Sequence, residues 1–473
     1  MVDDLITRDL AVLWHPCSQM RDYESFPPVE VIGADGCHVQ LADGRRVIDA
    51  ISSWWCKSLG HGHPHLRQAL HDQVDGFDQV IQANTTNRTV VRMCERLLSA
   101  ANGYPSARWG AGAGPGREPG WFGKVFLADN GSTAVEIALK MALQAQRQAG
   151  RIGRTRFAAL VDGYHGETVA TLSVGDCGLY GDPFRSMLFD VPKLGPLPRR
   201  RGPTDPDWLD AGDAWPAIER QLASQADQLA AIVYEPVLQG AGGMQLYSPD
   251  LLRRLRAWAD AHDVYLIADE IAAGMGRVGG ILASHLAAPA GPWYDHAGCL
   301  PDFAVLSKGL TGGMLPLSAV LTTDVIYEHF LGDYFDFTAF LHSNTYTGNP
   351  LGVAVADAAL DVYAGEGVLA QVAERGAYMG AALQSLASDR ADLHGWRACG
   401  MLAAVDIRRP DGSRLPREAR IGYRVFQEAL RRGAWLRPLG DTSYLMPPLT
   451  CDERIIDEMI AILADSLDAV LGG

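Results

Sequence analysis

The chain has 473 residues, of which 48% are apolar and 21% charged, and its formal net charge at pH 7 is −15. This composition excludes a disordered or fibrous protein, and the acidic balance argues against binding a nucleic-acid backbone as the main activity. Stretches without charge, such as residues 337–356, are interrupted by His, Asn, Gly and Pro, so we expect no membrane span.

The cell compartment is predicted from the first residues and the cysteines. Met-Val-Asp-Asp-Leu-Ile-Thr-Arg lacks both a basic and an apolar region, so we expect no secretory signal. The eight cysteines are scattered without Cys-x-x-Cys pairs, which favours reduced thiols over disulfides or a zinc site. We therefore expect a cytoplasmic protein that binds small molecules and holds no metal.

The first 66 residues predict an arm followed by antiparallel strands at 29–36, 38–44 and 46–51, punctuated by Asp-Gly. Two adjacent tryptophans, Trp54 and Trp55, cannot both face one core in regular structure. At least one is therefore expected to line a cleft or an interface, although one core Trp beside a half-exposed one fits the composition equally well. The three histidines at 61, 63 and 65 have no carboxylate or cysteine at ligand spacing, so turn or surface roles are expected.

Residues 64–98 have mainly helical spacing with Leu66, Ala69, Leu70 and Val74 on the inner face, and 103–120 read as a loop.

An alternating α/β series begins with a strand at 124–128 and a helix to about residue 143. Between them, Gly131 lets the backbone come close to a ligand, and Ser132 and Thr133 can cap the helix. Free N–H groups and the helix dipole make such a turn an anion site, but a plain N-cap would use the same residues.

The next predicted strands are 157–161, 228–234 and 264–268, with a helix at 250–262. Polar residues follow each strand, and ligands of open α/β sheets gather at the edge where strands end. Tyr164, flanked by glycines, suits stacking on a planar ligand, although a surface tyrosine in an ordinary turn would look similar. Asp269 ends an apolar strand, where a carboxylate is costly unless it meets a cation.

Lys308 follows the buried strand predicted at 303–306 and precedes a glycine-rich turn. Partial desolvation there would lower the pKa of its amine and suit it to condense with a carbonyl. A surface lysine that merely closes a strand would leave the same pattern.

The C-terminal part predicts helices at 351–365, 368–388 and 452–471 and strands at 400–407 and 434–437. This alternation indicates a small α/β domain that packs beside the N-terminal strands. We therefore divide the chain into an N-terminal arm with part of the small domain (1–66), a large cofactor-binding domain (67–345) and a C-terminal small domain (346–473).

Five motifs together resemble the fold-type I, class III pyridoxal-phosphate aminotransferases. They are DNGSTAVEIALK with Gly131 and Ser132, DGYHG with Tyr164 and His165, YEPVLQGAGG with Glu235, LIADEIAAGMGR with Asp269, and SKGLTGG with Lys308. The segments LWHPCSQM (13–20), SSWW (52–55), GNP (348–350) and WLRPLG (435–440) resemble the 7,8-diaminopelargonic acid aminotransferases of biotin synthesis.

The resemblance implies an α/β fold: a large domain with a mostly parallel seven-stranded sheet between helices, and a small α/β domain built from both termini. It also implies a homodimer with shared active sites and pyridoxal 5'-phosphate as cofactor. Lys308 would hold the cofactor and move a proton, Asp269 would pair with the pyridinium nitrogen, and Tyr164 would stack on the ring. The other implied cofactor-binding residues are Gly131, Ser132, His165, Glu235 and, from the neighbouring subunit, Thr345.

The implied reaction is amination of 8-amino-7-oxononanoate to 7,8-diaminononanoate, with S-adenosylmethionine as donor. Arg437 would bind the carboxylate and both tryptophans would line the channel for the aliphatic chain. Gly309, Gly348 and Cys17 complete the implied substrate-binding set.

Two departures leave the donor open. Many relatives that use S-adenosylmethionine have a tyrosine at the position of Cys17 and an aspartate at that of Glu167, and some relatives use lysine. A general ω-amine or diamine:pyruvate transaminase, a silent cofactor-binding protein, and a decarboxylase or aminomutase also stay open as functions of the chain. Arg277 is expected to order the turn after Asp269, and 287–300 to be a surface insertion.

Overall fold

The computed structural model describes residues 4–109, 120–288 and 298–472. The centre of the predicted loop at 103–120 and most of the predicted insertion at 287–300 lie outside the described residues.

A seven-stranded sheet of order β4-β13-β12-β11-β8-β5-β6 forms the centre of the molecule. Its strands are β4 (Lys124–Ala128), β5 (Arg156–Leu160), β6 (Lys193–Leu194), β8 (Leu229–Tyr234), β11 (Tyr265–Asp269), β12 (Phe303–Leu306) and β13 (Ser318–Thr322). Strand β13 runs antiparallel to β12 and β4, whereas the pairs from β12 to β6 are parallel. All residues of β8 and β12 are buried, as expected for parallel strands covered on both faces. The predicted α/β class and mostly parallel sheet are confirmed.

Helices cover the two faces of this sheet. Alternate residues of β12 point to opposite sides: Phe303 and Val305 pack with α5, and Ala304 and Leu306 pack with α4 and α11. The helices of this region are α3 (Pro64–Gly76), α4 (Arg88–Ala101), α5 (Gly131–Gln148), α6 (Val169–Val174), α7 (Gly178–Gly181), α8 (Trp215–Ala223), α9 (Asp250–Ala261), α10 (Asp324–Glu328) and α11 (Pro350–Gly365). A side sheet of order β7-β10-β9 joins β7 (Arg199–Arg200), β9 (Leu238–Gln239) and β10 (Gln245–Tyr247).

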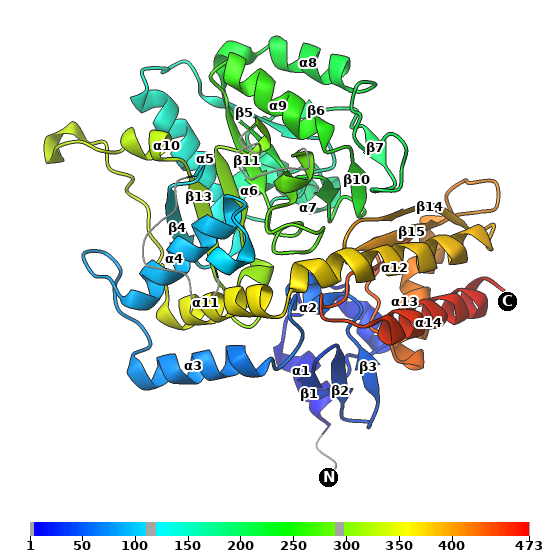
Figure 1. Ribbon diagram of the computed structural model, residues 1–473. Helices are drawn as coiled ribbons and strands as arrows, with labels where there is room; N and C mark the ends of the chain where they lie inside the picture. The colour runs from blue at the N-terminus through cyan, green and yellow to red at the C-terminus, as the bar shows by residue number, and fades with distance from the viewer. Residues whose placement is uncertain (1–3, 110–119, 289–297, 473) are drawn as a thin grey trace.

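The two ends of the chain pack together. The N-terminal sheet joins β1 (Val31–Asp35), β2 (His38–Leu41) and β3 (Arg46–Ile48), and the C-terminal sheet joins β14 (Leu393–Ala398), β15 (Ala403–Ile407) and β16 (Thr442–Leu445). Helices α12 (Val368–Ser388), α13 (Ile421–Arg432) and α14 (Glu453–Leu471) cover them, and Figure 1 shows the blue N-terminal strands beside the orange and red C-terminal helices. Ile48 pairs with Ala434 in a parallel bridge. The division at residues 66 and 345 stays a prediction.

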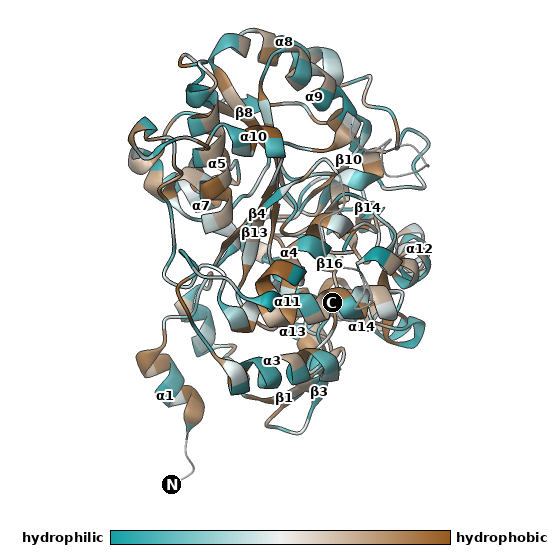
Figure 2. Ribbon diagram, turned by 60° about the vertical axis from the view of Figure 1, so that its left-hand side comes forward, coloured by the Kyte–Doolittle hydropathy of each residue, from teal (hydrophilic) through white to brown (hydrophobic). Residues whose placement is uncertain are grey.

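Short elements complete the chain. Helix α1 (Leu5–Val12) stands away from the rest in Figure 2, and α2 (Ser52–Trp55) is a single turn. The 3-10 turns are η1 (Met20–Glu24), η2 (Ser106–Arg108), η3 (Asp182–Met187), η4 (Ala226–Gln228), η5 (Ala283–Ala287), η7 (Lys308–Thr311), η8 (Tyr334–Asp336) and η9 (Arg417–Ala419). Within the described ranges, no helix is long and apolar enough to cross a membrane.

Several local predictions were wrong. The helix predicted over 64–98 is two helices, because α3 ends at Gly76 and Asn87 caps a new helix by accepting the N–H of Val90. Val74, expected inside, is exposed. The segment predicted as a strand at 434–437 forms only one bridge, to Ile48, while β14, α13 and β16 were not predicted.

Candidate active site

Four neighbouring strands end at one edge of the central sheet and deliver the residues that the sequence motifs single out. Tyr164 lies in the turn after β5, Glu235 follows β8, Asp269 ends β11 and Lys308 follows β12. Because β12, β11, β8 and β5 are adjacent and parallel, their carboxyl ends meet at the same edge. The predicted cluster at the sheet edge is therefore present.

Lys308 is half-buried and lines a cavity of about 790 Å³. Its Nζ lies 5.4 Å from the centre of the Trp55 ring, and burial lowers the pKa of the amine. The residue has φ +43°, a left-handed conformation that non-glycine residues keep mainly where the surroundings fix them. A methyl group at Gly309 would lie 2.8 Å from Met275 Cβ, so this glycine lets the strand end pack closely.

Asp269 is buried and held on both oxygens. Oδ2 lies 2.9 Å from Nδ1 of His165, and Oδ1 accepts the N–H of Ile271 at 3.1 Å. Nε2 of His165 is also buried and has no hydrogen-bond partner among the described residues. A fixed carboxylate with an unpartnered polar atom beside it suits a ligand that carries a positive, hydrogen-bonding ring atom.

Glu235 supports the turn that carries the aromatic ring. Its carboxylate accepts the N–H of Tyr164 at 2.9 Å and the N–H of Gly240 at 3.0 Å. Burial raises the pKa of Glu235 to about 7, and the Asp269 charge adds to this shift. These two hydrogen bonds indicate that Glu235 anchors the backbone of Tyr164 and acts on the site through it.

Tyr164 lies edge-on to Tyr180, with ring centres 5.4 Å apart, and its hydroxyl donates to Glu167 at 2.9 Å. Burial and the Glu167 carboxylate raise the pKa of this phenol far above its ordinary value, so the hydroxyl stays neutral. Tyr164 therefore lines the cavity as an uncharged aromatic surface.

The turn before α5 is tied to the same edge. Asn130 caps the helix by accepting the N–H of Thr133, and the Thr133 hydroxyl accepts the N–H of Asn130 at 3.4 Å in return. Thr133 thus takes part in the cap as predicted, whereas Ser132 does not. The first N–H groups of a helix have no partner within it, so those of Gly131 and Ser132 are available to an anion. A methyl group at Gly131 would lie 2.8 Å from Cδ1 of Ile271, and one at Gly166 would lie 2.1 Å from Oγ of Ser132. These close contacts place the helix start against the turns that carry Asp269 and His165.

Trp54, Trp55 and Arg437 line the cavity opposite Tyr164. Trp55 is buried and its Nε1 donates to the hydroxyl of Tyr444 at 3.0 Å, whereas Trp54 is 40% exposed. The Arg437 guanidinium lies 4.1 Å from the centre of the Trp54 ring and donates to the carbonyl of Cys17 at 2.9 Å. Both of these partners are neutral, so the positive charge of Arg437 is available to a ligand carboxylate.

Thr345 and Gly348 lie elsewhere in this chain. The exposed Thr345 accepts a hydrogen bond from the Gln79 side chain at 3.2 Å, and Gly348 has φ +66° and packs on Gln82. Neither lines the cavity that contains Lys308.

Sequence reasoning missed Tyr180 and Tyr444, which both line the cavity. Tyr180 stands between glycines at 178 and 181, the same signal that singled out Tyr164, and could have been found. Tyr444 lies in a strand that was not predicted.

Each of the three histidines near residue 63 pairs with one carboxylate from outside the local segment. His61 lies 2.8 Å from Asp49, His63 lies 3.2 Å from Glu366, and His65 lies 3.1 Å from Asp361. Two of these carboxylates are about 300 residues away along the chain, which hides them from local patterns. The described part of the chain holds no cluster of three or more His, Cys, Asp or Glu suited to a metal.

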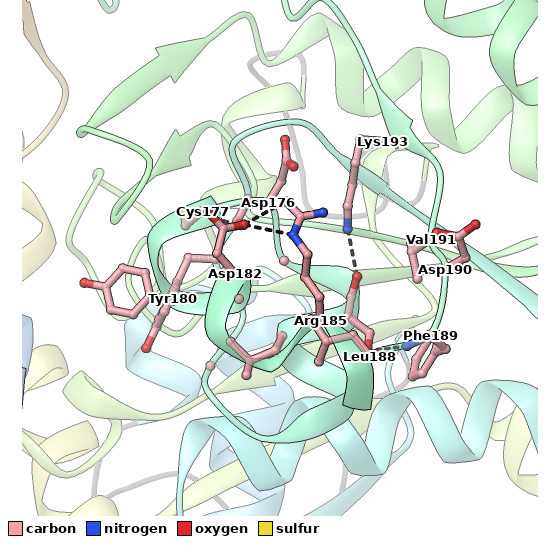
Figure 3. A pocket seen from close by; sticks show the side chains of 18 residues that line it. Asp176, Cys177, Tyr180, Asp182, Arg185, Leu188, Phe189, Asp190, Val191 and Lys193 are labelled. Atoms are coloured by element: carbon pink, nitrogen blue, oxygen red, sulfur yellow. Dashed lines mark hydrogen bonds and ion pairs between the residues drawn. The ribbon is translucent and has the colours of Figure 1, made fainter.

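A smaller cavity of about 240 Å³ is lined mainly by side chains of the segment 172–193 (Figure 3). It shares Tyr164, Cys177 and Tyr180 with the main cavity. Its charged groups are engaged locally: Lys193 donates to the carbonyl of Ser173 at 2.9 Å, and Arg185 pairs with Asp182. Burial lowers the pKa of Lys193 to about 8. The segment thus forms a polar wall of the main cavity.

Comparison with known proteins gives consistent matches. A family model described as aminotransferase class-III matches residues 19–467. The adenosylmethionine-8-amino-7-oxononanoate aminotransferase of Nitratidesulfovibrio vulgaris is 37% identical over 468 residues, covering 98% of this chain and 81% of that protein. The protein of the same name from Geobacter sulfurreducens is 35% identical over 465 residues, covering 98% and 96%. The crystal structure of the one from Methanocaldococcus jannaschii superimposes with a TM-score of 0.87 at 27% identity, over 98% of both chains.

Proposed function

Because this chain belongs to the class-III aminotransferases, which use pyridoxal 5'-phosphate, we propose that it aminates 8-amino-7-oxononanoate to 7,8-diaminononanoate in biotin synthesis. The observation that carries the proposal is one cavity that joins the amine of Lys308 to two tryptophans and the free charge of Arg437. An amine, an apolar channel and a cationic end match a keto substrate with an aliphatic chain and a terminal carboxylate.

The residues present fit the cofactor. Asp269 offers a fixed negative charge beside an unpartnered imidazole nitrogen, and the α5 N-terminus offers N–H groups for a phosphate at the same sheet edge. When bound, pyridoxal phosphate supplies an electron sink for the electron pair left when the substrate carbon loses its proton. We assign the ring-nitrogen contact to Asp269 and His165, the ring face to Tyr164, and the phosphate to Gly131 and Ser132. Glu235 supports Tyr164 from behind.

Lys308 is assigned two tasks. Its amine, with a pKa lowered by burial, would hold the cofactor. With substrate bound, the same Nζ would be the base that accepts the proton from the amine-bearing carbon of the substrate. The Trp55 ring, whose centre lies 5.4 Å from Nζ, shields the amine from solvent on one side.

Arg437 and the tryptophans orient the substrate. The guanidinium binds the terminal carboxylate, and the Trp54 and Trp55 rings cover the aliphatic chain. Gly309 and Cys17 do not line the cavity themselves; Gly309 follows Lys308 in the chain, and the Cys17 carbonyl accepts from Arg437. Donor and acceptor use the same cavity in turn, so we expect ping-pong kinetics.

S-adenosylmethionine is proposed as the amino donor because the matched relatives are named for it. The test is product formation from 8-amino-7-oxononanoate with S-adenosylmethionine, with lysine, or with a simple diamine as the only donor. We expect turnover with S-adenosylmethionine. Turnover with lysine alone would change the donor, and turnover only between diamines and pyruvate would overturn the proposed function.

We also propose a homodimer in the cytoplasm. All eight cysteines are free thiols, as a reducing compartment favours. The segment before Thr345 exposes a series of large apolar side chains, a feature that marks protein–protein contacts. They are Leu331, Tyr334, Phe335, Phe337 and Leu341. In the dimer, Thr345 would bind the phosphate of the neighbouring site, and Gly348 would border its substrate.

A further inference from the structure

Trp54 and Trp55, which line the main cavity, lie in a left-handed backbone turn. Four consecutive residues, from Ser52 to Trp55, have positive φ, between 44° and 75°. For L-residues other than glycine this left-handed conformation is strained, and it persists only where neighbours enforce it. The groups that enforce this turn therefore control where both indole rings point.

Asp49 holds the turn with both carboxylate oxygens. Oδ1 accepts the N–H of Ser53 at 2.8 Å, and Oδ2 accepts the Ser53 hydroxyl at 2.7 Å. His61 completes the arrangement, with Nε2 2.8 Å from Oδ2 of Asp49. Asp49 is only 2% exposed, so water cannot substitute for these partners.

The first residue of the turn is held separately. The Ser52 hydroxyl donates to the carbonyl of Met446 at 2.8 Å and accepts from Arg277 at 3.3 Å. The Met446 contact fixes the start of the turn to the C-terminal part of the chain, and the Arg277 contact fixes it to the turn after Asp269. Asp49 fixes the middle of the turn. Only the middle depends on the pair of Asp49 and His61.

The turn places one indole ring near the proposed reacting amine and the other near the proposed carboxylate-binding site. Trp55 lies beside Nζ of Lys308, and Trp54 lies against the guanidinium of Arg437. Asp49 and His61 do not line the cavity themselves. A rearranged turn would thus move the channel walls without removing any group that touches substrate.

We propose that Asp49 and His61 are positioning residues that enforce the left-handed turn 52–55 and thereby set the geometry of the substrate channel between Lys308 and Arg437. The proposal rests on the proposed function for its substrate, and it deepens that function by adding two residues outside the cavity. An aspartate is required because the turn presents two donors, Ser53 N–H and O–H, to the two oxygens of one carboxylate. His61 orients that carboxylate.

The test compares Asp49→Asn and His61→Asn with His65→Asn, whose histidine pairs with Asp361 on the surface. In Asp49→Asn an amide NH₂ replaces one acceptor. We expect both turn variants to raise KM for 8-amino-7-oxononanoate about tenfold or more with a smaller change in kcat, since misplacement of about 1 Å has effects of this size. We also expect an altered near-ultraviolet circular dichroism of tryptophan in the holoenzyme, and no change in His65→Asn.

Rescue gives a second, independent measurement. Ser53→Gly in the Asp49→Asn background lowers the cost of the left-handed conformation, because glycine adopts positive φ freely, so it should recover part of the KM and the tryptophan signal. Folded turn variants with wild-type KM and wild-type circular dichroism would overturn the proposal, and His61→Asn serves if Asp49→Asn does not fold. If the wild type does not accept 8-amino-7-oxononanoate, the proposed function fails, whereas the spectra and their rescue still decide whether Asp49 and His61 hold the turn.

Discussion

Individual side chains at the sheet edge are tuned mainly by burial. It lowers the pKa of the Lys308 amine and raises the pKa of Glu235 to about 7 from 4.5. The lowered pKa of Lys308 favours the reactive neutral amine. The raised pKa of Glu235 means that, between about pH 4.5 and about pH 7, the folded protein binds a proton that the unfolded chain releases.

We predict that Glu235 gives the enzyme a pH-dependent stability. Since its folded pKa is raised, its contribution is complete below about pH 4.5 and is lost as the pH rises through about 7, by on the order of 3 kcal/mol. In Glu235→Gln the slope should become shallower by the share of Glu235, while Glu270, whose pKa burial also raises to about 7, keeps its own share. The variant starts lower because its amide mismatches one backbone N–H. The measurement is the thermal midpoint of the holoenzyme between about pH 5 and about pH 7.5. Glu374→Gln, at an exposed carboxylate, is the control that should keep the wild-type slope.

We predict that Lys308→Ala folds but loses turnover by a factor of at least about 10³, because both its covalent and its proton-transfer task depend on Nζ. Lys193→Ala is the matched control. It removes another partly buried amine of lowered pKa, which lines only the smaller cavity, and it should retain most activity. Assays of both variants with the preferred donor decide the point, and wild-type turnover in Lys308→Ala would contradict the assignment.

At the scale of elements, the start of α5 shows how a helix is aligned with a sheet edge. Asn130 caps it, while Gly131 and Gly166 allow contacts that a side chain would prevent. The N–H groups assigned to the phosphate are therefore positioned by the packing of Gly131 on Ile271 and of Ser132 on Gly166.

We predict that Gly131→Ala weakens cofactor binding about tenfold or more, because the new methyl group would lie 2.8 Å from Cδ1 of Ile271 and push the helix start away. The double variant Gly131→Ala, Ile271→Val lacks that Cδ1 and should recover most of the affinity. Titration of apoenzyme with pyridoxal phosphate, followed by absorbance, measures both. Equal affinity in the wild type and Gly131→Ala would show that the helix start is not at the phosphate.

Element-level prediction from the sequence succeeded where the signal is local. Apolar runs ending in Glu235, Asp269 and Lys308 were sufficient to place these residues at one edge, because parallel strands bring their carboxyl ends together. Prediction failed where a competing local signal or a distant partner determines the structure. For example, Asn130 and not Ser132 caps α5. The left-handed turn at 52–55 could not be predicted, since none of its residues is glycine and the carboxylate that holds it belongs to the preceding strand segment.

At the scale of the whole molecule, one chain does not bring every assigned residue together. Lys308, Tyr164 and Arg437 share a cavity, but Thr345 lies outside it beside exposed apolar side chains. No sequence pattern within one chain reveals a partner's contribution, so here the resemblance alone supplied the expectation.

We predict that two inactive variants restore activity when their subunits are mixed. If Thr345 serves the neighbouring site, a heterodimer of Lys308→Ala and Thr345→Asp has one site with an intact Lys308 and an intact Thr345 from the other chain. Subunit exchange followed by assay should then recover activity, while each parent stays low. Without recovery in heterodimers verified by mass, Thr345 would act within its own chain or not at all.

Arg277, in the turn after Asp269, has a mechanical consequence for the whole enzyme. Its buried guanidinium donates to the carbonyls of Met401 and Pro447 at 2.7 Å each, and its own carbonyl accepts the N–H of Met401. A hinge rotation of the C-terminal lobe would strand this cation away from both acceptors, at a cost of several kcal/mol. These three hydrogen bonds therefore brace the turn after Asp269 against the C-terminal part of the chain and resist rotation of one against the other.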